Sequence, residues 1–526
     1  MRPPSVTLQK NTYWLFLACL ALVLMVLGGI ATSRYGAGVS SDSVKYMAVA
    51  QNLLEGNGLY DHRGWPLMAW PPLYSITLAA LVWLTGMDVF ILAWYLSILL
   101  LGVNFILSGV ILLRVFVDKP LYAYLGSLFI FLSISSLRNH ATVGSDVPYL
   151  TMTLVFLIVL DDYIRKRSYW AFAWMVLLSA LVPLLRYVGM AFAVTALLVI
   201  LIEHRKSVRV LWRDGPALGL LSVLPIFWWL VIHNIMTYGS LWGGYDSPGL
   251  VDVNQNIHLA LTKMLHWFVP YLDFLMPLLT QPFIVLALVA LILILINLRS
   301  PENWGNWARS FLHPTIYPTM IYALVYFFAV ALTIVTSDHR YLHSDRYYFI
   351  LLVPTMILLF VTFDALVRPH LKFSARQITS ALLVVFIVWA VYPIYGLREY
   401  LTEALERGEP SDYNIFNTSA YHEMSVVTEM QKLRRTHPDA FIYSNYVDAV
   451  WFYTRRPALL SPVRGAADLK VAYAGWPYDK PGYFVWFKPN EYKHYLSPEE
   501  LAQFSDVELI YSDVSGDIYY VSAPNY

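Results

Sequence analysis

Long apolar runs separated by short polar segments dominate the chain up to about residue 396. The first run, Tyr13 to Ser33, carries no charge and is long enough for the ~20 residues that a membrane-spanning helix needs. A shorter run covers 72–85. The others lie at 90–112, 121–137, 147–160, 169–185, 187–202, 216–236, 269–297, 314–336, 347–367 and 376–396. This pattern predicts an all-α polytopic membrane bundle of about eleven spans.

The distribution of basic residues predicts the orientation of the bundle. Three basic segments, 165–170, 203–213 and 368–376, mark cytoplasmic loops by the positive-inside rule. The N-terminus is then cytoplasmic, and the first run is a retained signal anchor. Everything after Gly396 then lies outside the cell. Parity allows only two spans in the region 72–137, so one of its three apolar runs is expected to be re-entrant or to lie along the surface.

The pattern changes after Gly396, where short strand-like and helical segments alternate. Helical spacing at 421–438, 447–456 and 497–504 alternates with β-branched and aromatic runs at 440–444, 483–487, 507–512 and 518–522. Alternation of this kind predicts a small α/β domain. We therefore expect two domains: a bundle over 1–396, with an outer loop at 34–71, and an extracytoplasmic α/β domain over 397–526.

Composition supports a membrane protein and excludes other classes. Of the 526 residues, 58% are hydrophobic and 13% are charged, against roughly a quarter charged in soluble domains. The 36 basic residues nearly balance the 35 acidic ones, so charge gives no reason to expect a nucleic-acid partner. The single cysteine, Cys19, excludes a disulfide framework and a cysteine metal site.

The first candidate for chemistry is Asp42, on a short amphipathic helix just after the first span. Ser40 or Ser41 can cap this helix, and Tyr46 falls one turn after Asp42 on the same face. A tryptophan- and proline-rich stretch at 63–74 follows and is typical of an interfacial lid. The simpler interpretation is that Asp42 only complements the helix dipole in the first turn.

A second group of polar residues joins two spans on the expected outer side. It contains Arg138, His140 and Asp146. Asp146 stands at the head of a helix, with Pro148 in the first turn, so it can also be a simple helix cap.

Arg186 and Tyr187 lie in a short turn between two apolar runs on the same side. An arginine in this place can extend toward lipid head groups. It can equally bind a phosphate.

The densest polar cluster beside a span is the segment 337–354. Arg340 and Arg346 offer planar forks for a phosphate, with Tyr347 nearby for stacking. His343 and its acidic neighbours also fit a metal site. A solvated loop is the third possibility.

Five motifs, in this order along the chain, resemble the GT-C superfamily of polytopic glycosyltransferases. The likeness is to bacterial members related to protein O-mannosyltransferases and lipid A aminoarabinose transferases. The motifs are "SSDSVKYMAVAQNLLEGNGL", "WPPLYSITLA", "GSDVPYLTMTL", "LLRYVGMAF" and "DRYYFILLVP". The resemblance covers residues 13–396, and we assign the last 130 residues to no family.

The resemblance implies transfer of a sugar from a polyprenyl-phosphate donor to a lipid, glycan or protein acceptor at the outer face of a bacterial inner membrane. It implies a general base or acceptor-orienting role for Asp42, with Asp146 as the second catalytic candidate. The physical requirements agree, because a hydroxyl nucleophile must lose its proton and a lipid-phosphate leaving group gains charge. The expected phosphate-binding residues are Arg186, Arg340 and Arg346, and the expected substrate-binding residues are Tyr46, Arg138, His140, Tyr187, His343 and Tyr347.

The sequence departs from the family at Asp42, which has no acidic neighbour; Asp61 is the only second acid nearby. We therefore expect transfer without a cofactor, and a divalent metal is possible but not favoured. Three alternatives stay open: a transporter of lipid-linked or small substrates, a non-catalytic scaffold or sensor, and a ligase that moves a whole glycan or an acyl group. A transporter would be expected to show internal repeats, and the sequence has none that is obvious.

Overall fold

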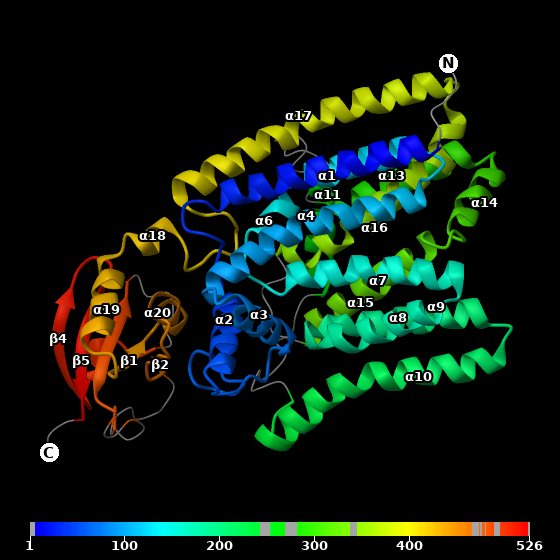
Figure 1. The fold of residues 1–526 in the computed structure, drawn as a ribbon. Coiled ribbons are helices and arrows are strands. Elements are labelled where there is room, and N and C mark those ends of the chain that lie inside the picture. The colour runs from blue at the N-terminus through cyan, green and yellow to red at the C-terminus, as the bar shows by residue number, and fades with distance from the viewer. Residues whose placement is uncertain are drawn as a thin grey trace.

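The computed structural model describes residues 6–241, 253–268, 281–336, 344–464, 473, 476–478, 480–488 and 495–523. A long helical bundle carries a small α/β domain at one end (Figure 1). We call this end of the bundle the domain end. The N-terminus lies at the far end of the bundle, and the C-terminus lies on the α/β domain.

Within the described ranges, eight helical segments are long and apolar enough to cross a bilayer. They contain α1 (Val6–Ala31), α4 (Val89–Val115), α7 (Asp146–Lys166), α9 (Met190–His204), α10 (Val208–Phe227), α15 (Ile316–Thr336), α16 (Leu352–Thr362) and α17 (Ala375–Arg407).

Shorter helices complete the bundle. Helices α5 (Pro120–Phe131) and α6 (Ile134–His140) form a pair bent by 53° that can count as one span. Helices α3 (Leu73–Thr85), α8 (Tyr169–Leu181) and α13 (Pro282–Asn297) are also apolar. With the bent pair counted as one span, the described residues contain nine candidate spans, which roughly agrees with the count of about eleven that the sequence predicts. With 13, 13 and 16 residues, α3, α8 and α13 are short for a span.

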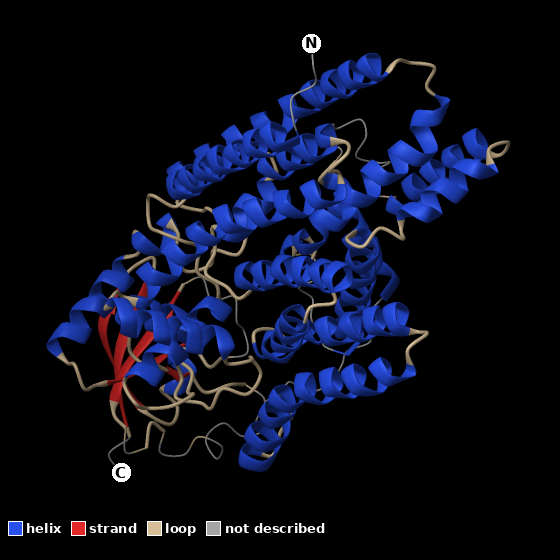
Figure 2. Ribbon diagram, turned by 45° about the vertical axis from the view of Figure 1, so that its right-hand side comes forward, coloured by secondary structure: helices blue, strands red, loops and turns tan. Residues whose placement is uncertain are grey.

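The two ends of the bundle differ in what they carry. The turns between α9 and α10 and between α16 and α17, which hold two of the basic segments, lie at the far end with α14 (Pro301–Ser310). Helix α2 (Ser41–Leu54) lies at the domain end, between the bundle and the α/β domain (Figure 1). Figure 2 shows that the strands gather in the small domain, beside the helices of the bundle. The remaining helix of the described bundle, α11 (Val253–His266), contacts α13 and α15.

The C-terminal domain confirms the predicted α/β alternation. Its five-stranded sheet has the order β2-β1-β3-β5-β4, with β1 parallel to β2 and β3 and with β5 antiparallel to β3 and β4. The strands are β1 (Phe441–Ser444), β2 (Leu459–Leu460), β3 (Gly482–Phe487), β4 (Asp506–Ser512) and β5 (Gly516–Ser522), and the helices are α18 (Ser419–His422), α19 (Ser425–Thr436), α20 (Val447–Thr454) and α22 (Pro498–Leu501). Among the described elements of this domain, the two-residue strand β2 and the separate short helix α18 were not predicted from the sequence.

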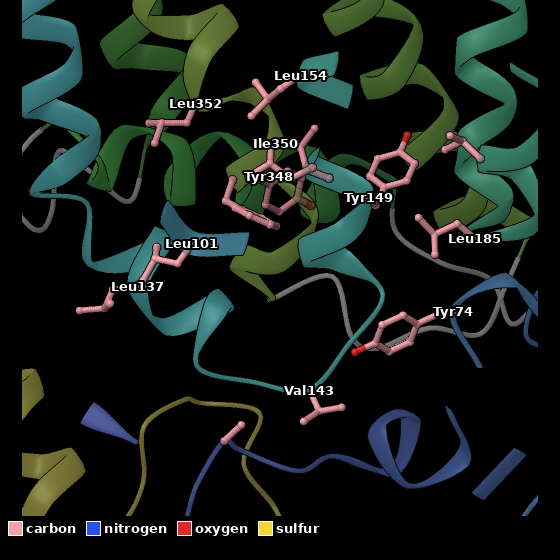
Figure 3. Packing of buried hydrophobic residues seen from close by; sticks show 14 of the residues in the cluster. Tyr74, Leu101, Leu137, Val143, Tyr149, Leu154, Leu185, Tyr348, Ile350 and Leu352 are labelled. Carbon is pink, nitrogen blue, oxygen red and sulfur yellow. The ribbon is translucent and has the colours of Figure 1, made fainter. Parts of the chain in front are cut away.

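Helix packing in the bundle depends on small residues and on buried hydrogen bonds. A Cβ atom on Gly109 of α4 would lie 2.5 Å from a methyl carbon of Leu17 on α1, so glycine permits the close approach of these two helices. The Tyr13 hydroxyl donates to the Gly109 carbonyl at 3.1 Å. Figure 3 shows how side chains of one buried cluster, among them Tyr149 and Leu352, fill the interior.

Three chain segments distant in sequence meet in extended form at the domain end. The Gly38 amide donates to the Ala141 carbonyl at 2.7 Å, and the Val143 amide donates back to the Gly38 carbonyl at 3.0 Å. The Ile415 amide donates to the Val39 carbonyl at 3.0 Å. Because these bonds use main-chain groups, they fix the start of α2 against the segment before α7 and against the segment after α17.

Asn417 holds the same junction from inside. Its side chain is 1% exposed, and its amide donates to the carbonyls of Tyr35 and Ala37, each at 2.8 Å. Its carbonyl oxygen lies 2.8 Å from Nε2 of His422. One buried side chain therefore connects the end of the first span with the start of the α/β domain.

We expect Asn417→Ala to destabilise the protein by about 1–3 kcal/mol, because it removes two buried hydrogen bonds and leaves their carbonyl groups unsatisfied. The measurement is thermal unfolding of the full chain in detergent. Asn57→Ala, at an exposed asparagine, is the control and should leave the midpoint unchanged. Equal midpoints for the wild type and Asn417→Ala would contradict the assigned role.

Candidate functional site

A small pocket at the domain end collects side chains from four separate parts of the chain. Its walls come from α2, from the segment that leads into α7, from the 3₁₀ turn Asp345–Tyr347, and from the segment after α17. The residues that line it are Ser40, Asp42, Tyr46, Asn139, Thr142, Val143, Gly144, Asp146, Val147, Arg346 and Tyr413. Four residues that the sequence singled out, Asp42, Tyr46, Asp146 and Arg346, are thus brought together.

Asp42 is presented by the first turn of α2. Ser40 is the N-cap and forms a capping box with Ser43, so the Asp42 carboxylate is left for other partners. Its Oδ1 accepts a hydrogen bond from Nε1 of Trp70 at 3.2 Å, and its Oδ2 accepts one from Nη1 of Arg346 at 3.2 Å. The side chain is 31% exposed, so a small molecule in the pocket could reach it.

Positive charges surround Asp42. Burial alone would raise the pKa of its carboxyl, but the charges of Arg346, Lys45 and Arg186 outweigh that effect and hold the pKa below the usual aspartate value. Lys45 lies over the Trp70 ring, 3.5 Å from its centroid. Asp42 is therefore a stable carboxylate at neutral pH.

Asp146 forms the second acid–arginine pair. Ser145 is the N-cap of α7, and no side chain caps this helix end, so helix capping does not account for Asp146. Instead, its Oδ1 pairs with Nη1 of Arg186. The same arginine donates to Oγ of Ser145 at 3.3 Å, and this oxygen lies 3.0 Å from the Tyr46 hydroxyl.

A tight reversal of the chain places Arg186 in the site. It lies between two 3₁₀ turns, Val182–Leu184 and Tyr187–Gly189. A Cβ atom on Gly189 would lie 2.6 Å from the carbonyl carbon and oxygen of Val182, so only glycine fits this reversal.

Aromatic rings hold both arginines. The Arg346 guanidinium lies 5.0 Å from the Tyr347 centroid and 5.6 Å from that of Tyr413, and the Arg186 guanidinium lies 5.7 Å from the same Tyr347 ring. Nη2 of Arg346 also donates to the Tyr347 hydroxyl at 2.9 Å. Its Nε is buried and has no hydrogen-bond partner within the described structure. A buried donor of this kind is rare without a ligand or water to accept from it.

Four of the predicted substrate-binding residues lie outside the pocket lining: Arg138, His140, Tyr187 and Tyr347, the last of which packs beside Arg346 and Arg186. Arg138 forms an ion pair with Asp412 at 2.9 Å, in the segment after α17. Tyr187 donates from its hydroxyl to the Met68 carbonyl at 3.1 Å and accepts from Nε1 of Trp229 at 3.1 Å. Tyr187 therefore holds the loop after α2 against the bundle.

His140 also lies outside the lining, and its side chain is buried. Nδ1 lies 2.7 Å from the Ser136 carbonyl, which can only accept, and Nε2 lies 3.0 Å from the Asn104 amide nitrogen, which can only donate. The ring therefore carries its proton on Nδ1 and is neutral.

Asp61, the second acid near Asp42 in the sequence, stabilises a turn. Its Oδ1 accepts the main-chain amides of Arg63 and Trp65, at 2.9 and 3.0 Å, and its Oδ2 pairs with the Arg63 guanidinium at 2.6 Å. Arg340 and His343 lie outside the described residues. Among the residues that are described, no three His, Cys, Asp or Glu side chains are grouped closely enough to hold a metal ion.

Sequence reasoning missed four residues that shape the site: Lys45, Trp70, Ser145 and Tyr413. The spacing could have shown Lys45, which follows Asp42 by three positions on α2, where side chains are neighbours. Trp70 belongs to the predicted lid. Tyr413 comes from an irregular segment with no recognisable pattern.

No protein-family model matches the chain, and no curated protein matches its sequence. Solved structures do match. ArnT from Cupriavidus metallidurans in the apo state superposes with a TM-score of 0.59 at 16% identity, over 97% of this chain and 98% of that one. The same protein bound to undecaprenyl phosphate gives 0.57 at 15% identity, over 96% and 97%. The oligosaccharyltransferase from Archaeoglobus fulgidus in the apo form gives 0.53 at 11% identity, over 97% and 74%.

These similarities identify the class of fold. The chain is an integral membrane protein with the GT-C glycosyltransferase fold, and the resemblance seen in its sequence motifs is confirmed at this level.

We expect Arg346→Gln to raise the pKa of Asp42, because it removes the largest positive contribution that opposes burial. An ordinary aspartate becomes protonated as the pH falls through about 4. In the wild type Asp42 stays ionised there, because its pKa is lowered. In the variant, protonation should occur at higher pH. Infrared titration of the carboxyl band, with Asp42→Asn as the reference, measures the shift. Arg346→Lys keeps the charge and is the matched control; an unchanged titration in Arg346→Gln would contradict the assignment.

Proposed function

We propose that the protein is a glycosyltransferase that moves a sugar from a polyprenyl-phosphate donor to a hydroxyl acceptor. The observation that carries this proposal is the pair of arginines around one tyrosine ring, Arg186 and Arg346 beside Tyr347. Arg346 lines the pocket together with Asp42 and Asp146, and Arg186 is joined to the pocket by its ion pair with Asp146. Arginine forks suit phosphate oxygens, and the buried, unpartnered Nε of Arg346 is a donor available for one of them.

The structural neighbours support a lipid-phosphate donor. One of them is bound to undecaprenyl phosphate, and the two proteins named above, ArnT and the oligosaccharyltransferase, are both transferases. The low identities mean that the roles of individual residues rest on the geometry of this chain alone.

The charge balance of the pocket suggests how a donor would engage it. Without substrate, Arg346 neutralises Asp42 and Arg186 neutralises Asp146. A donor phosphate that binds Arg346 would offset the positive charge of its guanidinium. The pKa of Asp42, which this charge lowers, would then rise. Asp42 would then become a better proton acceptor as the donor binds.

In the proposed step, an acceptor oxygen attacks the anomeric carbon of the sugar. The new carbon–oxygen bond forms as the bond to the phosphate oxygen breaks, and the electron pair of the broken bond goes to the phosphate. The acceptor proton goes to Asp42. The leaving polyprenyl phosphate gains negative charge, which Arg186 and Arg346 stabilise. Asp146 acts through Arg186 by fixing the position of its guanidinium.

The orientation of the enzyme in the membrane follows from the basic loops. We infer that the far end of the bundle faces the cytoplasm and that the domain end faces outward. The acceptor then approaches from outside, beneath the α/β domain, and the donor comes from the outer leaflet. In this arrangement Asp42, on the helix just after the first span, can reach both the acceptor and the donor.

We expect Asp42→Asn to lower the release of free polyprenyl phosphate by about 10²–10⁴-fold, the usual contribution of general base catalysis. The assay uses the protein in nanodiscs, with a panel of polyprenyl-phosphate sugars as donors and a membrane extract as the acceptor source. Glu55→Gln alters an exposed acid at the end of the same helix and is the matched control.

The outcomes of this assay separate the alternatives. Equal release by the wild type and Asp42→Asn would remove the base role from Asp42 and leave Asp146 as the next acid to test. Failure of the wild type to release polyprenyl phosphate from any donor would overturn the transferase proposal and favour a scaffold or transporter.

We expect Arg186→Lys to weaken the binding of polyprenyl phosphate about tenfold, because lysine keeps the charge opposite Asp146 but loses the planar fork. Binding is measured by fluorescence titration in detergent. Arg407→Lys, at an exposed ion pair with Glu403, is the control. Wild-type affinity in Arg186→Lys would exclude Arg186 from the phosphate site.

A further inference from the structure

A second hollow lies on the α/β domain, apart from the pocket around Asp42. It measures about 410 Å³, and Gln431, Arg434, Arg435, Pro438 and Tyr453 line it. Two of these residues are arginines in the last turn of α19. The wall opposite comes from α20, through Tyr453.

Arginines from two elements converge here without matching acids. Burial and the charge of Arg456, just after α20, lower the pKa of Arg434, so the two guanidinium groups lie close enough to repel each other. Across the described parts of the chain, no carboxylate forms an ion pair with Arg434, Arg435 or Arg456. Only the neighbouring Arg455 has such a partner, Asp88 at 3.7 Å.

The simple explanation is that basic residues in the last turn of a helix favour its dipole. The helix dipole explains why Arg434 and Arg435 lie at the end of α19. It does not explain why Arg456, which lies just after α20, is near them, or why Arg434 is partly buried among like charges. Crowding of cations without an acid is unfavourable on its own, and an anion would relieve it.

Helix α20, which carries Tyr453, also contacts the edge of the bundle through neighbouring residues. Asp88, the partner of Arg455, is the N-cap of α4, and the Phe452 ring of α20 packs on the Phe90 ring of α4 with centroids 5.3 Å apart. Trp83 and Leu84, at the end of α3, are 77% and 69% exposed. Exposed tryptophan beside spanning helices is typical of a membrane interface.

We propose that this hollow binds an anionic phosphate group through Arg434 and Arg435, which line it, with Arg456 adding positive charge beside Arg434. The phosphate belongs either to a lipid head group at the membrane surface or to a compound in solution, since both offer the same oxygens to the arginine forks. Tyr453 provides a wall; its hydroxyl already donates to the Phe416 carbonyl at 2.8 Å. The site is separate from the transferase pocket and does not depend on the function proposed there.

The test is hydrogen–deuterium exchange of the full chain in nanodiscs, followed by mass spectrometry. Three conditions are compared: neutral phosphatidylcholine, the same lipid with phosphatidylglycerol, and neutral lipid with inorganic phosphate matched by chloride at equal ionic strength. Protection is measured over 429–438 and 450–457, with 482–487 of β3 as the internal reference. Wild type is compared with the triple variant Arg434→Gln, Arg435→Gln, Arg456→Gln.

We expect slower exchange over 429–438 and 450–457 in the wild type and its loss in the triple variant. Protection only with phosphatidylglycerol assigns the site to a lipid head group, and protection by inorganic phosphate assigns it to a soluble compound. Lys432→Gln, on α19 but ion-paired with Glu429, should keep the protection. A single Arg434→Gln change should weaken the response to phosphate about tenfold.

Two results would overturn the proposal: equal exchange of the wild type in all three conditions, or equal protection in the wild type and the triple variant. All three arginines lie on the surface of the domain, and unchanged exchange in β3 verifies that the variant folds.

Discussion

The pairing of two acids with two arginines is the interaction on which the domain end of the bundle depends; Asp146 is buried and Asp42 is partly exposed. Asp42 and Arg346 are far apart in sequence, as are Asp146 and Arg186, and each pair joins separate helices. Removing one member of a buried pair leaves an uncompensated charge, which is strongly destabilising. The pairs therefore define how α2, α7 and the turns at Arg186 and Arg346 come together. Within each pair, the charge of the arginine balances that of the acid.

The surroundings of the pocket are rigid, and this rigidity matters for its chemistry. Main-chain bonds fix the segment before α2 at Gly38 and Val39, and Asn417 joins that segment to the α/β domain. Groups held in this way need little reorganisation when charge develops in a transition state.

Much of the fold could be predicted from the sequence because lipid imposes strong patterns. Membrane-spanning helices need long apolar runs, and the α/β domain alternates between helical and strand patterns. The sequence therefore predicts both. Asp42, Asp146 and Arg346 stood out as charges beside spans, and the structure brings them to one pocket. Arg138, His140 and Tyr187 stood out in the same way but form contacts elsewhere, because a local pattern does not reveal a partner such as Asp412 that is distant in sequence. Tyr413 carried no signal, since it belongs to an irregular segment.

The α/β domain also contacts residues beside the pocket around Asp42. Asp448 of α20 lies 2.7 Å from Nε2 of the buried His62, in the loop after α2. Burial alone would raise the pKa of Asp448, but the hydrogen bond from His62 and the charge of Lys45 hold it below the usual aspartate value. Lys45 in turn lies over Trp70, the hydrogen-bond donor to Asp42. A chain of charged and aromatic contacts thus runs from the domain to the carboxylate. The domain therefore helps to set the position and charge of the groups around Asp42, because the loop that carries Trp70 and His62 is held between the domain and the bundle.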